Sequence, residues 1–186
     1  MFKYLYEYVD RIAKLDFGGP FQSVQKQRAE IQRAIPSLVS VGHGSYANVF
    51  GIDRNPRIVF RVSYNWEEFD DHMRFAKLCL RYSKDPHLPE IYDARAHADL
   101  VFITVMKRYS KLSHRSTEQC QLAIRGQPLE GPYPWRESLL KTRGRLWSAG
   151  LNILDAGGNN ILQDERGTPI LVDPHVPESR GYSLWT

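Results

Sequence analysis

The stretch from Leu38 to Met106 alternates short β-rich runs with one amphipathic segment, and this pattern restricts the possible folds most strongly. Five runs are expected to form strands, at residues 38–41, 47–52, 58–63, 90–94 and 100–106. Turn-forming residues at 53–56 and 95–99 join neighbouring runs, and apolar residues at helical spacing predict a helix from Asn65 to Tyr82. The pattern predicts an α+β fold: a five-stranded antiparallel sheet with an inserted helix.

The flanking segments are predicted to be mostly helical. Residues 1–35 show helical spacing with a break at Gly18–Pro20, and this helical segment either packs on the sheet or presents a face to a partner. Glycine and proline in Ser110–Pro134 indicate an irregular connection with at most a short helix around Gln119–Ile124. A helix at Trp135–Ala149 and two short strands, 161–163 and 169–172, are expected to follow.

Composition is that of an ordinary globular protein. With 186 residues, 42% of them hydrophobic and 25% charged, the chain is expected to form one compact unit. We expect a helical extension at 1–37, an N-terminal lobe at 38–109, and a connection with a minimal C-terminal lobe at 110–186. No apolar run reaches the roughly 18 residues of a membrane span, so no membrane association and a cytoplasmic location are expected.

Cysteine and charge usage exclude some classes of protein. Cys79 and Cys120 lie far apart with no partner motif, which favours buried reduced thiols over a zinc site or a disulfide. The formal charge of +4 is spread over basic residues mixed with acidic ones, so nucleic-acid binding is not expected.

Two glycines lie between the first two predicted strands, in Gly42-His43-Gly44-Ser45-Tyr46. Bare backbone there could fold over phosphate oxygens and donate N–H groups to them. A tight hairpin uses glycine for the same steric reason, so this motif alone leaves both interpretations open.

A second group of polar residues follows the last predicted helix. Asp155 is followed five residues later by Asn160, and Asp173 ends the last predicted strand, so a short hairpin would bring Asn160 and Asp173 together. Oxygen ligands placed in this way suit Mg²⁺ chelated with a triphosphate. The alternative is that these side chains stabilise turns, as Asp and Asn commonly do.

These elements follow one another in the order that phosphoryl transfer requires. The order is a glycine loop, a basic strand residue, an inserted helix, an acid with an amide, and an acid at a strand end. It resembles the protein kinase superfamily, and is most similar to the early-gene serine/threonine kinases of autographiviral podophages. The stretches that carry this resemblance are Gly42-x-Gly44 with Ala47, Leu88–Asp93, Asn160-Ile161-Leu162 and Val172-Asp173-Pro174.

The resemblance implies ATP and Mg²⁺ as cofactors and a role for each matching residue. Asp155 would orient and deprotonate the acceptor hydroxyl, and Asn160 and Asp173 would hold the metal. The backbone of Gly42, His43, Gly44, Ser45 and Tyr46 would cover the phosphates. Val49 and the strand around Val105–Arg108 would line the adenine pocket.

The chain departs from the family pattern at three places. Arg61 stands where the family has a lysine, and it is either a phosphate ligand or an exposed strand arginine. The helix acid that would pair with Arg61 is Glu67, Glu68 or Asp71, with Glu68 or Asp71 preferred. Only 13 residues follow Asp173, so a much reduced C-terminal lobe is expected.

Three functions are compatible with these features. The first is a serine/threonine protein kinase of phage type that phosphorylates host bacterial proteins, such as transcription or RNA-processing machinery, and itself, in the host cytoplasm. The second is an inactive pseudokinase-like module that binds and inhibits a host or defence protein, as Arg61 and the reduced lobe would favour. The third is a small-molecule kinase of the aminoglycoside or choline type, which normally needs a large helical lobe.

Overall fold

The computed structural model describes residues 3–15, 17, 23–44, 47–63, 69–97, 101–151 and 160–173. Residue contacts divide the chain into two units. Unit 1 comprises Met1–Ala76 and Glu90–Arg108, and unit 2 comprises Lys77–Pro89 and Tyr109–Thr186. Compared with the boundaries expected from the sequence, the N-terminal helical segment therefore belongs with the sheet, and residues 77–89 belong with the C-terminal half.

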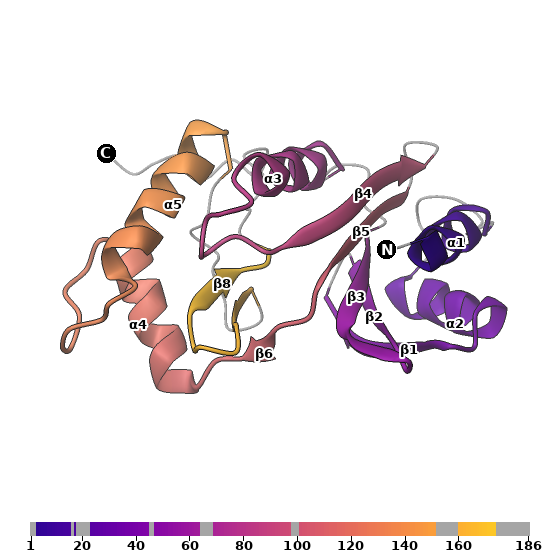
Figure 1. Cartoon of the computed structure of the whole chain (residues 1–186), viewed down its shortest axis with the longest axis horizontal. Helices are drawn as coiled ribbons and strands as arrows, with labels where there is room; N and C mark the ends of the chain where they lie inside the picture. Colours follow the sequence, from indigo (N-terminus) through magenta and orange to yellow (C-terminus); the bar gives the residue numbers. More distant parts are fainter. Residues whose placement is uncertain are drawn as a thin grey trace. The chain divides into compact units, whose positions relative to one another are not determined.

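Unit 1 is built on a five-stranded antiparallel sheet (Figure 1). Its strands are β1 (Leu38–His43), β2 (Ala47–Ile52), β3 (Asn55–Ser63), β4 (Ile91–His97) and β5 (Val101–Lys107), in the order β1-β2-β3-β5-β4. Helix α3 (Phe69–Arg81) stands between β3 and β4 in the chain. The α+β fold with a five-stranded antiparallel sheet and an inserted helix, as predicted from the sequence, is confirmed.

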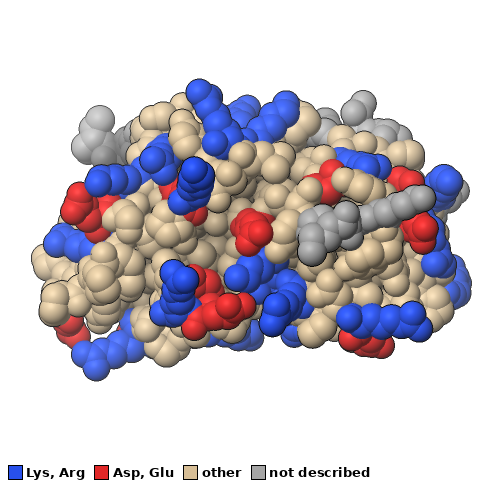
Figure 2. All heavy atoms as spheres, in the orientation of Figure 1, with Lys and Arg blue, Asp and Glu red and all other residues tan. Residues whose placement is uncertain are grey.

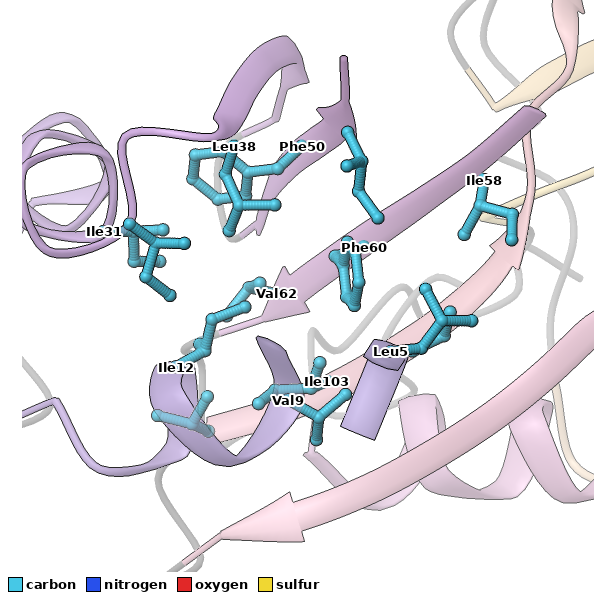
Figure 3. Packing of buried hydrophobic residues seen from close by; sticks show 14 of the residues in the cluster. Leu5, Val9, Ile12, Ile31, Leu38, Phe50, Ile58, Phe60, Val62 and Ile103 are labelled. Atoms are coloured by element: carbon cyan, nitrogen blue, oxygen red, sulfur yellow. The ribbon is translucent and has the colours of Figure 1, made fainter. Parts of the chain in front are cut away.

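Helices α1 (Lys3–Ala13) and α2 (Val24–Ala34) pack on one face of this sheet. Ser23 begins α2 by accepting a hydrogen bond from the Lys26 amide at 3.3 Å. Figure 3 shows apolar side chains of the helices meeting those of the strands, among them Leu5, Val9, Ile12 and Ile31 against Leu38, Phe50, Phe60, Val62 and Ile103. Of the two roles considered for this segment, these contacts support packing on the sheet.

The turn after β2 is shorter than expected. Asn55 already pairs with Ile52, so the hairpin turn is Asp53-Arg54 rather than 53–56, and Pro56 lies inside β3. A register irregularity separates this pair from Gly51 and its partner Val59. Pro56, which has no N–H to donate, lies within the irregularity, where no partner on β2 is required.

Unit 2 contains two helices and a small sheet among its described residues. These elements are β6 (Ser110–Lys111), α4 (His114–Ile124), α5 (Arg136–Ser148), β7 (Ile161–Gln163) and β8 (Pro169–Leu171), with the strands in the order β6-β7-β8. Gly150, with φ 72°, ends α5 as predicted. Cys79 and Cys120 are buried free thiols, as expected, and burial raises the pKa of Cys120 to about 12.

Helix α4 is longer than the sequence predicted. The expected short helix at 119–124 instead begins at His114, because the Ser113 hydroxyl caps it and accepts the Ser116 amide at 3.1 Å. Its first two turns are polar, so they carry no apolar spacing by which a helix could be recognised. No helix in the described part of the chain is long and apolar enough to span a membrane.

Candidate nucleotide and metal site

The residues of the glycine motif lie at the hairpin between β1 and β2. Gly42 pairs with Val49, His43 pairs with Asn48, and the Gly44 amide donates to the Ala47 carbonyl at 2.8 Å. Ser45 and Tyr46 lie outside the described residues.

Steric demands of the protein do not explain the two glycines. A Cβ at Gly42 would meet the Val49 Cβ at an ordinary 3.9 Å, and a Cβ at Gly44 would meet nothing within 4 Å among the described atoms. Neither glycine has the left-handed backbone conformation that would require glycine. The described atoms around this hairpin would therefore accept a side chain at either glycine.

Cross-strand register places three predicted site residues in one row. Gly42 pairs with Val49, and Val49 pairs in turn with Arg61 on β3. Paired residues share a face of a sheet, and this face is opposite to that of Phe50 and Phe60, which pack against α1 and α2. Within unit 1 the fold therefore brings Gly42, Val49 and Arg61 together.

The guanidinium of Arg61 is held by two neighbouring side chains. Its Nη1 donates to the Ser63 hydroxyl and to the His72 Nδ1, the latter at 3.1 Å. Since arginine can only donate, this Nδ1 must carry no proton. Ser63 and His72 are buried and Arg61 is half-buried, so the structure does not support the interpretation of Arg61 as an exposed strand arginine.

His72 is a neighbour of Arg61 that the sequence analysis missed. Its spacing of four residues from Glu68 in the sequence, which predicts the same face of the expected helix, was the available signal. Of the acids expected to pair with Arg61, Asp71 forms an ion pair with Arg74 at 3.5 Å, while Glu67 and Glu68 lie outside the described residues.

In unit 2, a hairpin brings the two predicted metal ligands to neighbouring positions. Ile161 pairs with Leu171, and the Val172 amide donates to the Asn160 carbonyl at 2.9 Å, directly before Asp173. The hairpin predicted from the sequence is thus confirmed, and both side chains are half-buried at its open end. Asp155 lies outside the described residues.

The turn of this hairpin depends on Asp164 and Gly167. The Asp164 carboxylate accepts the amides of Arg166 and Thr168 at 2.9 and 2.8 Å, and Gly167 has φ 79°. These bonds set the register that pairs Asn160 with Val172.

An amide and a carboxylate at neighbouring positions suit a hard cation that takes its remaining ligands from phosphate oxygens and water. No group of three His, Cys, Asp or Glu side chains that could hold a metal occurs among the described residues.

A polar cluster in unit 2, which the sequence analysis missed, supports the same hairpin. His87 is buried, its Nδ1–H donates to the Pro169 carbonyl at 2.7 Å, and its Nε2 lies 2.7 Å from the Ser138 hydroxyl oxygen, which also lies 3.0 Å from the Trp135 carbonyl. The Leu171 amide donates to the His87 carbonyl at 2.9 Å. Burial lowers the pKa of His87, which favours this neutral imidazole.

Asp85 holds the turn that carries His87. Its Oδ1 accepts the His87 amide at 3.0 Å and the Thr142 hydroxyl at 2.7 Å, and its Oδ2 accepts from Arg145. The segment before β4 is thereby joined to α5.

The predicted adenine-pocket strand has a mixed pattern of burial. Val105 is fully buried in the core beneath α1 and α2, and the following Met106 is 6% exposed. The Arg108 amide donates to the Arg57 carbonyl at 2.7 Å and so extends the pairing of β3 with β5.

Comparisons with known proteins give structural but no sequence relatives. No protein-family model matches the chain, and no curated protein matches it. Two similar solved structures are the Cydia pomonella granulovirus kinase PK-1, with 13% identity and a TM-score of 0.44, and the CAK complex of Chaetomium thermophilum bound to ATP-gamma-S, with 15% identity and a TM-score of 0.43.

Both matches cover 82% of this chain but only 58% and 50% of the matched chains. The match thus spans somewhat more than half of the first of those chains and half of the second.

Proposed function

We propose that the chain is a Mg·ATP-dependent serine/threonine protein kinase of phage type that phosphorylates host bacterial proteins, and itself. The observation that carries the proposal is the hairpin that pairs the Asn160 backbone with Val172, beside Asp173. Two oxygen ligands at neighbouring positions, preceded by the acid Asp155, form a set suited to phosphoryl transfer.

In this proposal each group has one task. Asn160 and Asp173 hold Mg²⁺, which supplies charge neutralisation of the phosphates when bound. Asp155 orients the acceptor hydroxyl and takes its proton as the hydroxyl oxygen bonds to the γ-phosphorus and the bond to the β–γ bridging oxygen breaks. The backbone of residues 42–46 covers the phosphates, and Val49 contacts the adenine.

The glycine at position 44 supports this role for the hairpin. The described protein atoms would tolerate a Cβ at Gly44, so the fold does not explain why this residue is glycine. Close approach of a ligand to the backbone would explain it. In the proposal the phosphates lie against this backbone and accept its N–H groups.

Partners and location follow from the same proposal. The acceptors would be proteins of the host bacterial cytoplasm, with transcription or RNA-processing machinery as candidates. On the face shown in Figure 2, Lys and Arg side chains are interspersed with Asp and Glu side chains, so that face offers no continuous basic stripe for nucleic acid.

The alternative is a pseudokinase-like module that binds and inhibits a host or defence protein. Arg61 favours it, because the guanidinium already donates to Ser63 and His72 instead of leaving all its N–H groups to a nucleotide. The two functions make opposite predictions for Arg61→Lys. An effect on ATP affinity is expected if Arg61 binds phosphate, and none is expected if the arginine only joins β3 to α3.

Purified protein incubated with γ-labelled ATP and Mg²⁺, with and without bacterial lysate, tests the proposal. Label on protein that disappears in Asp173→Ala is the expected result. Absence of label from folded protein under all conditions would reject the kinase and leave the binding module.

A further inference from the structure

A hollow on unit 2 gathers basic side chains around an aromatic ring. Its volume is about 430 Å³, and it is lined by the end of α3, the turn that follows, and α5. Four of the lining side chains are cations: Arg81, Lys84, Lys141 and Arg145. Asp85 is the one carboxylate among the described residues that line it.

The carboxylate of Asp85 neutralises only one of these cations. Its side chain is 1% exposed and both oxygens are turned inward, toward Thr142, the His87 amide and Arg145. Since the carboxylate is committed to these bonds, it does not pair with Arg81, Lys84 or Lys141.

Lys141 is paired only weakly. Its Nζ lies 2.9 Å from the Glu137 carboxylate one turn earlier in α5, but both side chains are largely exposed. Neither Arg81 nor Lys84 forms an ion pair with any residue in the described part of the chain. The hollow therefore carries an excess of positive charge that an anion would relieve.

The ring of Tyr82 holds two of the guanidinium groups in place. The Cζ of Arg145 lies 4.8 Å from the ring centroid and that of Arg81 lies 5.6 Å from it. Arg145 is fixed twice, by the ring and by Asp85, so little side-chain entropy is lost when its remaining N–H groups bind a ligand.

We propose that this hollow binds a phosphomonoester, either a phosphorylated side chain or a phosphorylated small molecule. Planar guanidinium forks match phosphate oxygens, lysine ammonium groups add point charges, and the exposed Ser83 offers a hydroxyl donor. The hollow is in the size range of sites that hold organic ligands, so it has room for the group that carries the phosphate. This inference does not rest on the proposed kinase activity, because the predicted nucleotide and metal ligands do not line the hollow.

Titration of the full-length ¹⁵N-labelled chain with O-phospho-L-serine, at constant ionic strength, tests the proposal. Saturable shifts are expected at the backbone amides of residues 81–84 and 141–145. The double variant Arg81→Gln/Lys84→Gln should bind roughly tenfold or more weakly. The matched control Arg125→Gln removes an exposed cation elsewhere on unit 2 and should bind as the wild type does.

A parallel titration with inorganic phosphate shows whether the organic part of the ligand contributes to binding. Tighter binding of phosphoserine supports a ligand whose organic part also contacts the hollow, whereas equal binding supports recognition of the phosphate group alone. The proposal is overturned if neither compound shifts these amides, or if the double variant binds phosphoserine as tightly as the wild type does.

Discussion

The buried carboxylate of Asp85 joins the turn before β4 to helix α5. It accepts hydrogen bonds from the His87 amide, the Thr142 hydroxyl and Arg145. Hydrogen bonds to a charged acceptor contribute more than neutral ones, and their loss leaves buried donors unsatisfied. At this residue, therefore, a polar cluster stabilises the unit that carries Asn160 and Asp173.

Replacing Asp85 with Ala is expected to lower the free energy of unfolding by about 2–4 kcal/mol, because two buried donors lose their acceptor. Urea denaturation followed by circular dichroism measures this. Glu137→Ala is the matched control in the same unit, since that acid is exposed and its one ion pair among the described residues is with Lys141. An Asp85→Ala variant as stable as the control would show that the hydrogen bonds of Asp85 do not stabilise this unit.

The pH dependence of stability is expected to reflect His87. Burial lowers its pKa in the folded state from the ordinary 6.5, although the nearby charges of Asp85 and Asp164 act in the opposite direction. The unfolded chain therefore takes up the proton first as the pH falls. The contribution of neutral His87 to the free energy of unfolding is fully present above about pH 6.5 and decreases as the pH falls below that value.

Denaturation midpoints measured from about pH 7 to about pH 5.5 test this sign. The wild type should lose stability over that range, and His87→Gln should lose less. His97→Gln, which changes an exposed histidine on β4, should keep the wild-type dependence. A wild-type midpoint that rises on acidification would show that the sign is wrong.

At the scale of whole elements, α1 forms part of the hydrophobic core under the sheet. Ile12 is fully buried there with Val62 and Ile103 (Figure 3). Ile12→Ala is expected to lower the free energy of unfolding by about 2–5 kcal/mol, and the exposed Lys14→Ala should have little effect. If thermal and urea denaturation give the two variants the same stability, α1 does not contribute to the core in this way.

The strands and the hairpin before Asp173 could be predicted from the sequence because their signals are local. Runs of β-branched residues and the turn at Asp164 and Gly167 each lie within a few residues. The contacts of His87 could not be predicted, because Ser138 and Pro169 lie 51 and 82 residues further along the chain. The length of helix α4 was underestimated, because its first turns are polar and its start is marked only by the capping residue Ser113.

For the candidate site, the sequence predicted which residues take part and in what order they occur. It did not predict which side chains contact them. The spacing between Asn160 and Asp173 predicted their meeting through a hairpin, which the structure confirms for the backbone. The bond from Arg61 to His72 crosses from a strand to a helix, and which helix side chain meets the strand depends on how the two pack.

At the scale of the whole molecule, the chain has two units, each holding part of the proposed machinery. Gly42, Val49 and Arg61 belong to unit 1, and Asn160 and Asp173 belong to unit 2.

The proposed function assigns Asp155 to phosphate transfer and not to nucleotide binding. Measuring Mg·ATP affinity by calorimetry and phosphate transfer by γ-label on the same preparations of wild type and Asp155→Asn tests it most directly. The Asp155→Asn variant should bind Mg·ATP with unchanged affinity and transfer phosphate about 100-fold or more slowly than the wild type. Transfer by Asp155→Asn at the wild-type rate would contradict this assignment.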